Sequence, residues 1–236
     1  MLRPFAMTPR LSLFALFCWI VLWPLHDVSA QMAGGGDSSL QADRAEQAIA
    51  LQEYDAAREI LSRTNDSDHP AIARARARLA IDEGECDLAV SILARPDLAK
   101  DELGAMLGDI ARGCARVTAA NVIDRDDAKG IEIRYQDEHD RDLTPLIIET
   151  VVKARDALTR DLDATWPRVT RIVVVRDLLS LSAMTGLPYE SAKTTGTVAV
   201  AKWGRTTLTS PRAPRHGYGW RDTLAHELTH RAVSRK

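Results

Sequence analysis

The stretch Arg171-Ile172-Val173-Val174-Val175-Arg176 decides the fold class of the C-terminal half of the chain. Four consecutive β-branched residues between two arginines favour a buried strand at the centre of a sheet. Upstream, Ile131, Ile133 and Tyr135 alternate with polar residues, which is the spacing of a strand with one buried face. We therefore expect a sheet with the 171–176 strand at its centre.

The segments around this strand predict an α+β domain. Residues 144–162 carry apolar side chains at helical spacing, with Thr144 as the cap and Pro145 at the first helical position, so a long helix should cover one face of the sheet. Asp177 is expected to cap a short helix. Residues 197–209 surround Trp203-Gly204 and predict a β-hairpin. The order strand, helix, strand, hairpin and final helix is typical of the α+β class.

A helical region precedes this domain. Residues 40–120 are rich in Ala, Leu, Arg, Glu and Asp at helical spacing, and the polar stretch 124–130 after them marks a domain boundary. Within the region, residues 52–63 align with residues 84–95, an offset of about 32 that is close to the tetratricopeptide period. We therefore expect two tetratricopeptide-like helical hairpins, a scaffold that can dock a protein partner, and an α+β domain over residues 130–236.

Cys86 and Cys114 are the candidates for a disulfide. In the expected helical hairpins Cys86 begins one helix and Cys114 ends the antiparallel helix that follows, so both thiols should lie at the same end. A bond between them would close a loop of about 28 residues. Two separate buried thiols are the alternative.

The N-terminus has the features of an export signal. Residues 1–30 combine a basic start, an apolar run over residues 11–22 and the small-residue site Val28-Ser29-Ala30. The apolar run is about twelve residues and a membrane-spanning helix needs about twenty, so an uncleaved anchor is the alternative rather than the expectation. Residues 31–39 include three consecutive glycines and predict a flexible linker. We expect a periplasmic or extracellular protein without a stable membrane anchor.

Charge does not indicate a nucleic-acid partner. The chain has 31 Lys and Arg against 33 Asp and Glu, a formal net charge of −2. A nucleic-acid-binding domain usually carries a basic excess clustered on one face. We therefore expect no nucleic acid among the partners.

The candidate catalytic motif is His226-Glu227-Leu228-Thr229-His230. In a helix, His226 and His230 lie on one face one turn apart, so both can bind one zinc ion. Glu227 can then reach the metal-bound water and act as general base. The alternative is an amphipathic helix with two surface histidines.

The third zinc ligand is the open question of this motif. A hydrolytic zinc has three protein ligands and a water, and residues 231–236 contain no His, Cys, Asp or Glu. We therefore expect that the sequence is a fragment of a longer protein, or that its site is incomplete and inactive.

Four other side chains are candidates for smaller roles. Asp222, one turn before His226, can orient that imidazole, or it can interact with the helix macrodipole as an acid of the first turn. His216, in a loop rich in Pro and Gly, can stabilise an oxyanion or be an ordinary loop histidine. His69 and His139 stand among polar residues, and we expect both to be solvated.

The element order, together with residues 194–201, the Ser210-Pro211-Arg212 turn and residues 224–230, resembles the peptidase MA-like family of gluzincin-type zinc metallopeptidases. The resemblance covers roughly residues 131–236. It implies a zincin-like fold, often after tetratricopeptide-like helices in exported bacterial members. It also implies that His226 and His230 bind zinc and that Glu227 is the catalytic base. The third ligand would be a glutamate in a downstream Trp-x-x-Glu-Gly-like helix, which implies a C-terminally truncated sequence.

These observations predict an exported zinc metallopeptidase that hydrolyses peptide bonds through a zinc-activated water. A peptide or protein substrate would add to the edge of the 197–209 hairpin as an extra strand, although this segment can also be an ordinary hairpin. Two alternatives stay open. One is a helical-repeat scaffold or partner-binding protein with a degenerate peptidase domain, and the other is a zinc hydrolase that acts on a non-peptide substrate.

Overall fold

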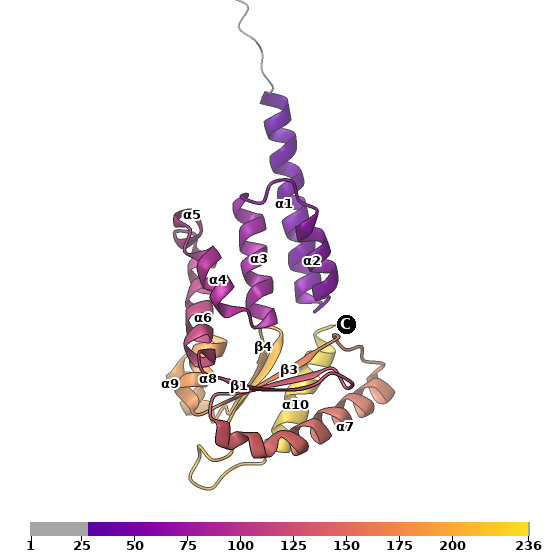
Figure 1. The fold of residues 1–236 in the computed structure, drawn as a ribbon, viewed down its shortest axis with the longest axis vertical. Coiled ribbons are helices and arrows are strands. Elements are labelled where there is room, and N and C mark those ends of the chain that lie inside the picture. The colour runs from indigo at the N-terminus through magenta and orange to yellow at the C-terminus, as the bar shows by residue number, and fades with distance from the viewer. Residues whose placement is uncertain (1–27, 236) are drawn as a thin grey trace, which may run out of the picture.

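A five-stranded mixed sheet lies between two groups of helices in the computed structural model, which describes residues 28–235 (Figure 1). The strand order is β1-β2-β3-β5-β4, with β1 antiparallel to β2, β2 and β5 parallel to β3, and β4 antiparallel to β5. The strands are β1 Val122–Asp126, β2 Ile131–Tyr135, β3 Thr170–Val175, β4 Ala199–Lys202 and β5 Arg205–Thr209. The predicted central strand is therefore confirmed as β3.

Each face of β3 contacts a different group of helices, because successive side chains of a strand point to opposite faces. Ile172 and Val174 belong to a core that includes residues of α7 Thr144–Leu162 and α10 Trp220–Val233. Val173 and Val175 belong to a core with residues of three other helices, α4 Cys86–Leu93, α6 Glu102–Thr118 and α8 Leu178–Thr185. The predicted mixed α and β architecture is confirmed at this level.

The N-terminal region is all-helical, as predicted, and its helices stand over one side of the sheet (Figure 1). They are α1 Val28–Ala50, α2 Tyr54–Ser62, α3 Pro70–Glu83, α4 Cys86–Leu93, α5 Pro96–Ala99 and α6 Glu102–Thr118. The two aligned segments, 52–63 and 84–95, correspond to α2 and α4. The start of α4 is bonded to α6 by the predicted disulfide between Cys86 and Cys114, whose Cα atoms are 5.8 Å apart.

The flexible linker expected over residues 31–39 is wrong, because α1 runs through it without interruption. Ala42, Ala45 and Ile49 are buried and anchor the second half of this helix, and the helical ladder extends from there towards the N-terminus. Of the expected signal segment, residues 1–27 lie outside the described residues and residues 28–30 form the first turn of α1. Within residues 28–235, no helix combines the length and the apolarity that crossing a bilayer requires.

The polar stretch 124–130 is not a loop throughout, because residues 124–126 belong to strand β1. The charges on this edge strand have partners: Arg125 binds Glu132 at 3.0 Å and Asp124 binds Arg141 at 2.8 Å. Exposed edge strands commonly carry charged side chains, so polarity alone does not exclude a strand. The sheet therefore begins at Val122.

Smaller elements complete the C-terminal region: η1 Glu138–Leu143, α8 Leu178–Thr185 and α9 Tyr189–Thr195, of which α9 was not predicted. Asp177 caps α8 as expected, since its carboxylate accepts a hydrogen bond from the Ser180 amide at 2.7 Å. Thr144 is not the cap of α7. Its hydroxyl instead donates to Asp124 and lies 2.7 Å from the Tyr135 hydroxyl.

The tip of the β4–β5 hairpin inserts into the helical region. Trp203 and Gly204 have φ values of 53° and 66°, as a tight two-residue hairpin turn requires. Trp203 packs among helical residues such as Ile81, and its indole N–H donates to the Thr185 carbonyl at 3.0 Å. A Cβ at Gly204 would lie 2.3 Å from the Asp82 carbonyl oxygen, so the turn and α3 are in close contact.

Candidate metal centre

Helix α10 presents the predicted motif on its exposed side. Leu224 and Leu228, four residues apart, are fully buried against the sheet. His226 and His230 are exposed, and Glu227 is half-buried between the two environments. The apolar residues of one face therefore fix the helix on the sheet and leave both imidazoles accessible.

The two imidazoles converge on one point. The Nε2 atoms of His226 and His230 are 3.0 Å apart, and the rings are nearly perpendicular, at 84°. The ligand atoms of His226, Glu227 and His230 all lie within 4.8 Å of one another. A tetrahedral zinc with zinc–nitrogen bonds of about 2.0–2.1 Å holds two nitrogens roughly 3.3 Å apart. The pair therefore fits a zinc ion with a small separation of the rings.

Glu227 is fixed to the edge of the sheet. Its Oε2 atom accepts a hydrogen bond from the backbone N–H of Ala201 in β4 at 2.7 Å. The Thr209 amide donates to the Val198 carbonyl. The backbone N–H and C=O groups of residues 198 and 200 therefore point towards β5, and those of residues 199 and 201 point away from the sheet. The Ala201 amide is thus an outward-pointing donor of an edge strand, and the Glu227 carboxylate is its acceptor. The sequence contains a usable signal for this, because a two-residue hairpin turn fixes which residues face outward.

No third ligand joins this group within the described residues. The residues that could hold a metal ion are His226, Glu227 and His230, and they are called the metal group below. Two histidines and a carboxylate that reaches the water make the zinc-helix half of a hydrolytic site, whereas a complete site has three protein ligands. The donor set therefore fits zinc in type and spacing but is one ligand short.

Arg231 fixes the last turn of α10 from the opposite side. The side chain is only 4% exposed, and Nη2 donates to Oε1 of Gln52 at 2.7 Å. Gln52, in the turn between α1 and α2, returns a bond to the Arg231 carbonyl at 3.4 Å. Burial lowers the pKa of Arg231 below its usual value. This contact between distant segments was not predicted, because no local pattern indicates it.

Asp222 and His216 do not support the metal group. Asp222 is exposed in the first turn of α10, and its carboxylate forms no hydrogen bond with His226 or with any other described residue. This placement agrees with the macrodipole alternative, because an acid in the first turn is stabilised by the helix dipole. His216 is exposed in the loop before α10, and its side chain has no hydrogen-bond partner among residues 28–235.

The other two histidines of residues 28–235 lie away from the motif and contact neighbouring residues of their own segments. His69 is half-buried and not simply solvated as expected: it caps α3, with Nδ1 accepting a bond from the Ala71 amide at 3.3 Å. His139 is exposed as predicted, and its Nδ1 lies 2.9 Å from Oδ1 of Asp137. This contact is the main cause that lowers the pKa of Asp137 to about 2. Neither histidine belongs to the metal group.

Comparison of the chain with family models, curated proteins and solved structures found no match.

Proposed function

We propose that this chain carries the zinc-binding helix and the substrate-binding edge of an exported zinc metallopeptidase. In this proposal His226 and His230 bind the metal and Glu227 is the general base. The supporting observation is that the two Nε2 atoms converge to 3.0 Å beside a carboxylate fixed to an edge strand. Zinc bound there would lower the pKa of its water to about 7 and polarise a carbonyl oxygen.

Glu227 supplies the proton acceptor in this mechanism. The Ala201 amide holds one carboxylate oxygen, Oε2, and leaves Oε1 to accept a proton from water at the metal. A carboxylate that is positioned before the substrate arrives loses little rotational freedom in the reaction. The backbone of β4 therefore sets the direction from which Glu227 acts.

The same strand provides the peptide-binding surface. β4 is at the edge of the sheet, and the outward carbonyl groups of Ala199 and Ala201 can accept bonds from an added strand. An added strand would lie about 4.8 Å from β4, on the side where Glu227 meets Ala201. A peptide bound in this way would present its backbone carbonyls next to the metal-binding residues.

The proposed zinc site needs a third protein ligand in addition to His226 and His230. The family resemblance implies a glutamate C-terminal to Lys236. With two histidines alone, we expect weak zinc binding and inefficient hydrolysis, because a hydrolytic site uses three protein ligands. The described residues are therefore proposed to hold two of the three protein ligands of the active site.

Elemental analysis of residues 31–236 after equilibration with zinc tests the metal site. We expect bound zinc that is lost in His226→Ala and kept in His216→Ala, whose imidazole lies outside the group. Zinc at background level in all three proteins would contradict the metal site. In a chain extended by the downstream glutamate, Glu227→Gln should retain zinc and lower peptide hydrolysis by about 10²–10⁴-fold.

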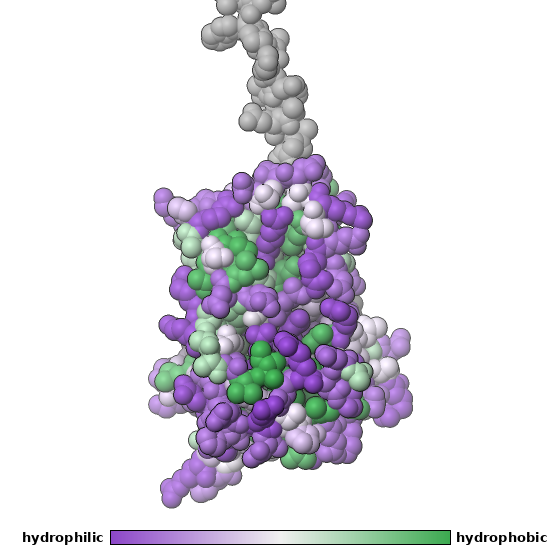
Figure 2. Space-filling model, viewed as in Figure 1, coloured by the Kyte–Doolittle hydropathy of each residue, from purple (hydrophilic) through white to green (hydrophobic). Residues whose placement is uncertain are grey.

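A second candidate is partner binding by the helical region. A groove of about 630 Å³ is lined by α2, α3 and α4, and Leu88 beside it is 54% exposed. Leu103 and Met106 on α6 are also exposed, and Figure 2 shows apolar area on this side of the helices. This candidate gains support if the zinc analysis is negative, because a scaffold needs no metal.

A further inference from the structure

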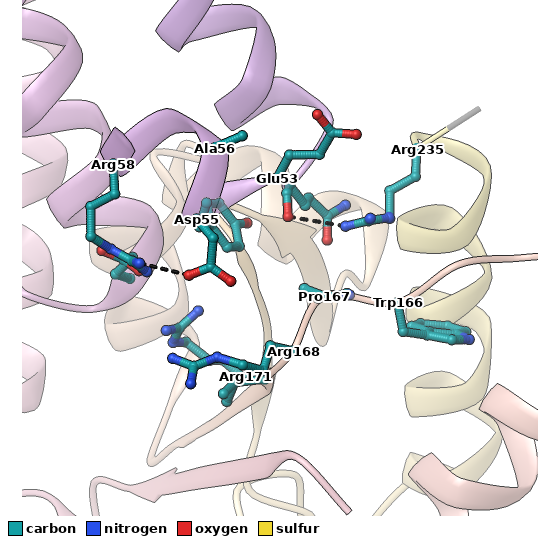
Figure 3. A pocket seen from close by; sticks show the side chains of 13 residues that line it. Glu53, Asp55, Ala56, Arg58, Trp166, Pro167, Arg168, Arg171 and Arg235 are labelled. Atoms are coloured by element: carbon teal, nitrogen blue, oxygen red, sulfur yellow. Dashed lines mark hydrogen bonds and ion pairs between the residues drawn. The ribbon is translucent and has the colours of Figure 1, made fainter. Parts of the chain in front are cut away.

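A polar cavity of about 210 Å³ lies where three distant parts of the chain meet (Figure 3). Its walls come from the turn between α1 and α2, the segment that leads into β3, and the end of α10. The cavity is separate from the metal group, because none of His226, Glu227 and His230 lines it. Its volume corresponds to several water molecules, at about 30 Å³ each.

The acidic side chains around the cavity are already neutralised or point elsewhere. Arg58 binds Asp55 at 2.6 Å and Glu83 at 2.7 Å, so one arginine occupies both carboxylates. The Glu53 carboxylate points away from the other labelled side chains in Figure 3. The charge of Asp55 also acts on Arg168, but none of the three acids forms an ion pair with the remaining arginines of the cavity.

Three guanidinium groups form no ion pair with an acid among the described residues. The Arg168 side chain forms no hydrogen bond or ion pair within residues 28–235, and the Nε atom of Arg171 is buried without a hydrogen-bond partner. Arg235 donates only to neutral oxygens, the Thr165 hydroxyl at 3.3 Å and the Gln52 carbonyl at 3.1 Å. Figure 3 shows Arg168 and Arg171 side by side, with both guanidinium groups facing the Asp55 side of the cavity. A partly enclosed group of like charges attracts a counter-ion.

We infer that this cavity binds a small oxyanion, the phosphate or carboxylate group of a small molecule. Guanidinium groups match both groups geometrically, through paired N–H donors. A bound anion would give the buried Nε of Arg171 its missing acceptor and offset the three unpaired positive charges. It would also connect the helical region, through Gln52 and Tyr54, to the last turn of the metal-binding helix.

Isothermal titration calorimetry on the chain tests the site, with inorganic phosphate and sodium acetate as separate probes at constant ionic strength. We expect saturable binding of one anion per chain, and a loss of at least tenfold in affinity in Arg168→Ala. This residue is exposed, so its replacement should leave the fold intact. The matched control is Arg176→Ala, an exposed arginine that follows the opposite end of β3 and should bind as the unchanged chain does.

Each outcome decides the inference. Tighter binding of phosphate identifies a phosphate site, and tighter binding of acetate identifies a carboxylate site. Absence of saturable binding by either probe overturns the inference, as does equal loss in Arg168→Ala and Arg176→Ala. Thermal unfolding with and without phosphate gives a second reading: the midpoint should rise with phosphate in the unchanged chain and in Arg176→Ala, and should rise less in Arg168→Ala.

Discussion

Gln52 and Arg231 are 179 positions apart in the sequence, yet Nη2 of Arg231 donates to Oε1 of Gln52 at 2.7 Å. Gln52 adopts a φ of 59°, which is uncommon for a residue other than glycine. The contact directs the α1–α2 turn onto the end of the helix that carries the zinc motif. It therefore couples the placement of that helix to the helical region.

Gln52→Ala should lower the free energy of unfolding by about 2 kcal/mol, because it removes the acceptor of a buried guanidinium group. Urea denaturation of the variant and the unchanged chain measures this difference. Gln47→Ala is the control, since Gln47 is exposed on α1 and should change stability by no more than about 0.5 kcal/mol. Equal effects of the two substitutions would contradict a structural role for the Gln52 contact.

Ala201→Pro should destabilise the chain more than Ala199→Pro. Both substitutions remove an outward-facing amide of an edge strand, where proline is tolerated. Only the Ala201 amide binds Glu227 in the described structure. Because hydrogen bonds to charged groups contribute about 1.5–3 kcal/mol, we expect a difference of about that size in the urea unfolding of the two variants. Equal unfolding curves would show that the contact with Glu227 contributes nothing to stability.

The stability of the chain should fall as the pH rises from about 4 to about 6, as a result of Asp82. Burial raises the pKa of this carboxyl from 3.8 to about 6, against the opposing charges of Arg78 and Arg205. The folded state therefore binds a proton more tightly than the unfolded state, and its advantage is lost as the pH passes the folded pKa. A shift of this size corresponds to about 3 kcal/mol at most.

Urea unfolding of the unchanged chain and of Asp82→Asn across pH 3.5–7 isolates this effect. The difference between the two curves should change between about pH 4 and 6 and be flat above about pH 7. Asp137 and Asp124, whose pKa values are lowered by hydrogen bonds, act in the opposite direction. Their contribution is lost as the pH falls below about 4, and it cancels in the difference. A difference curve without a slope between pH 4 and 6 would contradict the assignment to Asp82.

Loss of the Cys86–Cys114 disulfide should lower the free energy of unfolding by about 3.5 kcal/mol in the chain-entropy model, because the bond closes a 28-residue separation. The comparison is between the oxidised chain and the double variant Cys86→Ala, Cys114→Ala, with urea as denaturant. Adding a thiol reductant should destabilise the oxidised chain and leave the double variant unchanged. A reductant effect of equal size in both proteins would contradict the prediction.

The elements predicted correctly from the sequence are those with strong local patterns. The Ile172–Val175 run, the helical periodicity of residues 144–162 and the Trp203-Gly204 turn each fix one element through side-chain spacing or backbone conformation. The His226 and His230 spacing likewise places both imidazoles on one face of α10. Helical periodicity also placed Cys86 and Cys114 at the same end of their hairpin.

The features missed from the sequence depend on partners far along the chain. β1 resembles a polar loop because its charges are paired with Glu132 and Arg141 only after the sheet forms. The binding of Glu227 to Ala201 requires the hairpin and α10 to dock first. The glycines of α1 suggested a linker, but the buried half of that helix extends its regular structure through them. The third zinc ligand stays a prediction.

The hairpin tip makes the helices and the sheet difficult to separate. Trp203 occupies a socket among the helices, and the fully buried Arg205 donates to the Ile81 carbonyl at 2.6 Å. A protein cut before β1 would leave an indole and a charged guanidinium in water-exposed positions at the tip of the β4–β5 hairpin. Exchange of the helices with those of another protein would succeed only if the new helices supplied an apolar site for Trp203 and a carbonyl acceptor for Arg205. The β4 edge and its helical neighbour are thus expected to be inherited together and to change together.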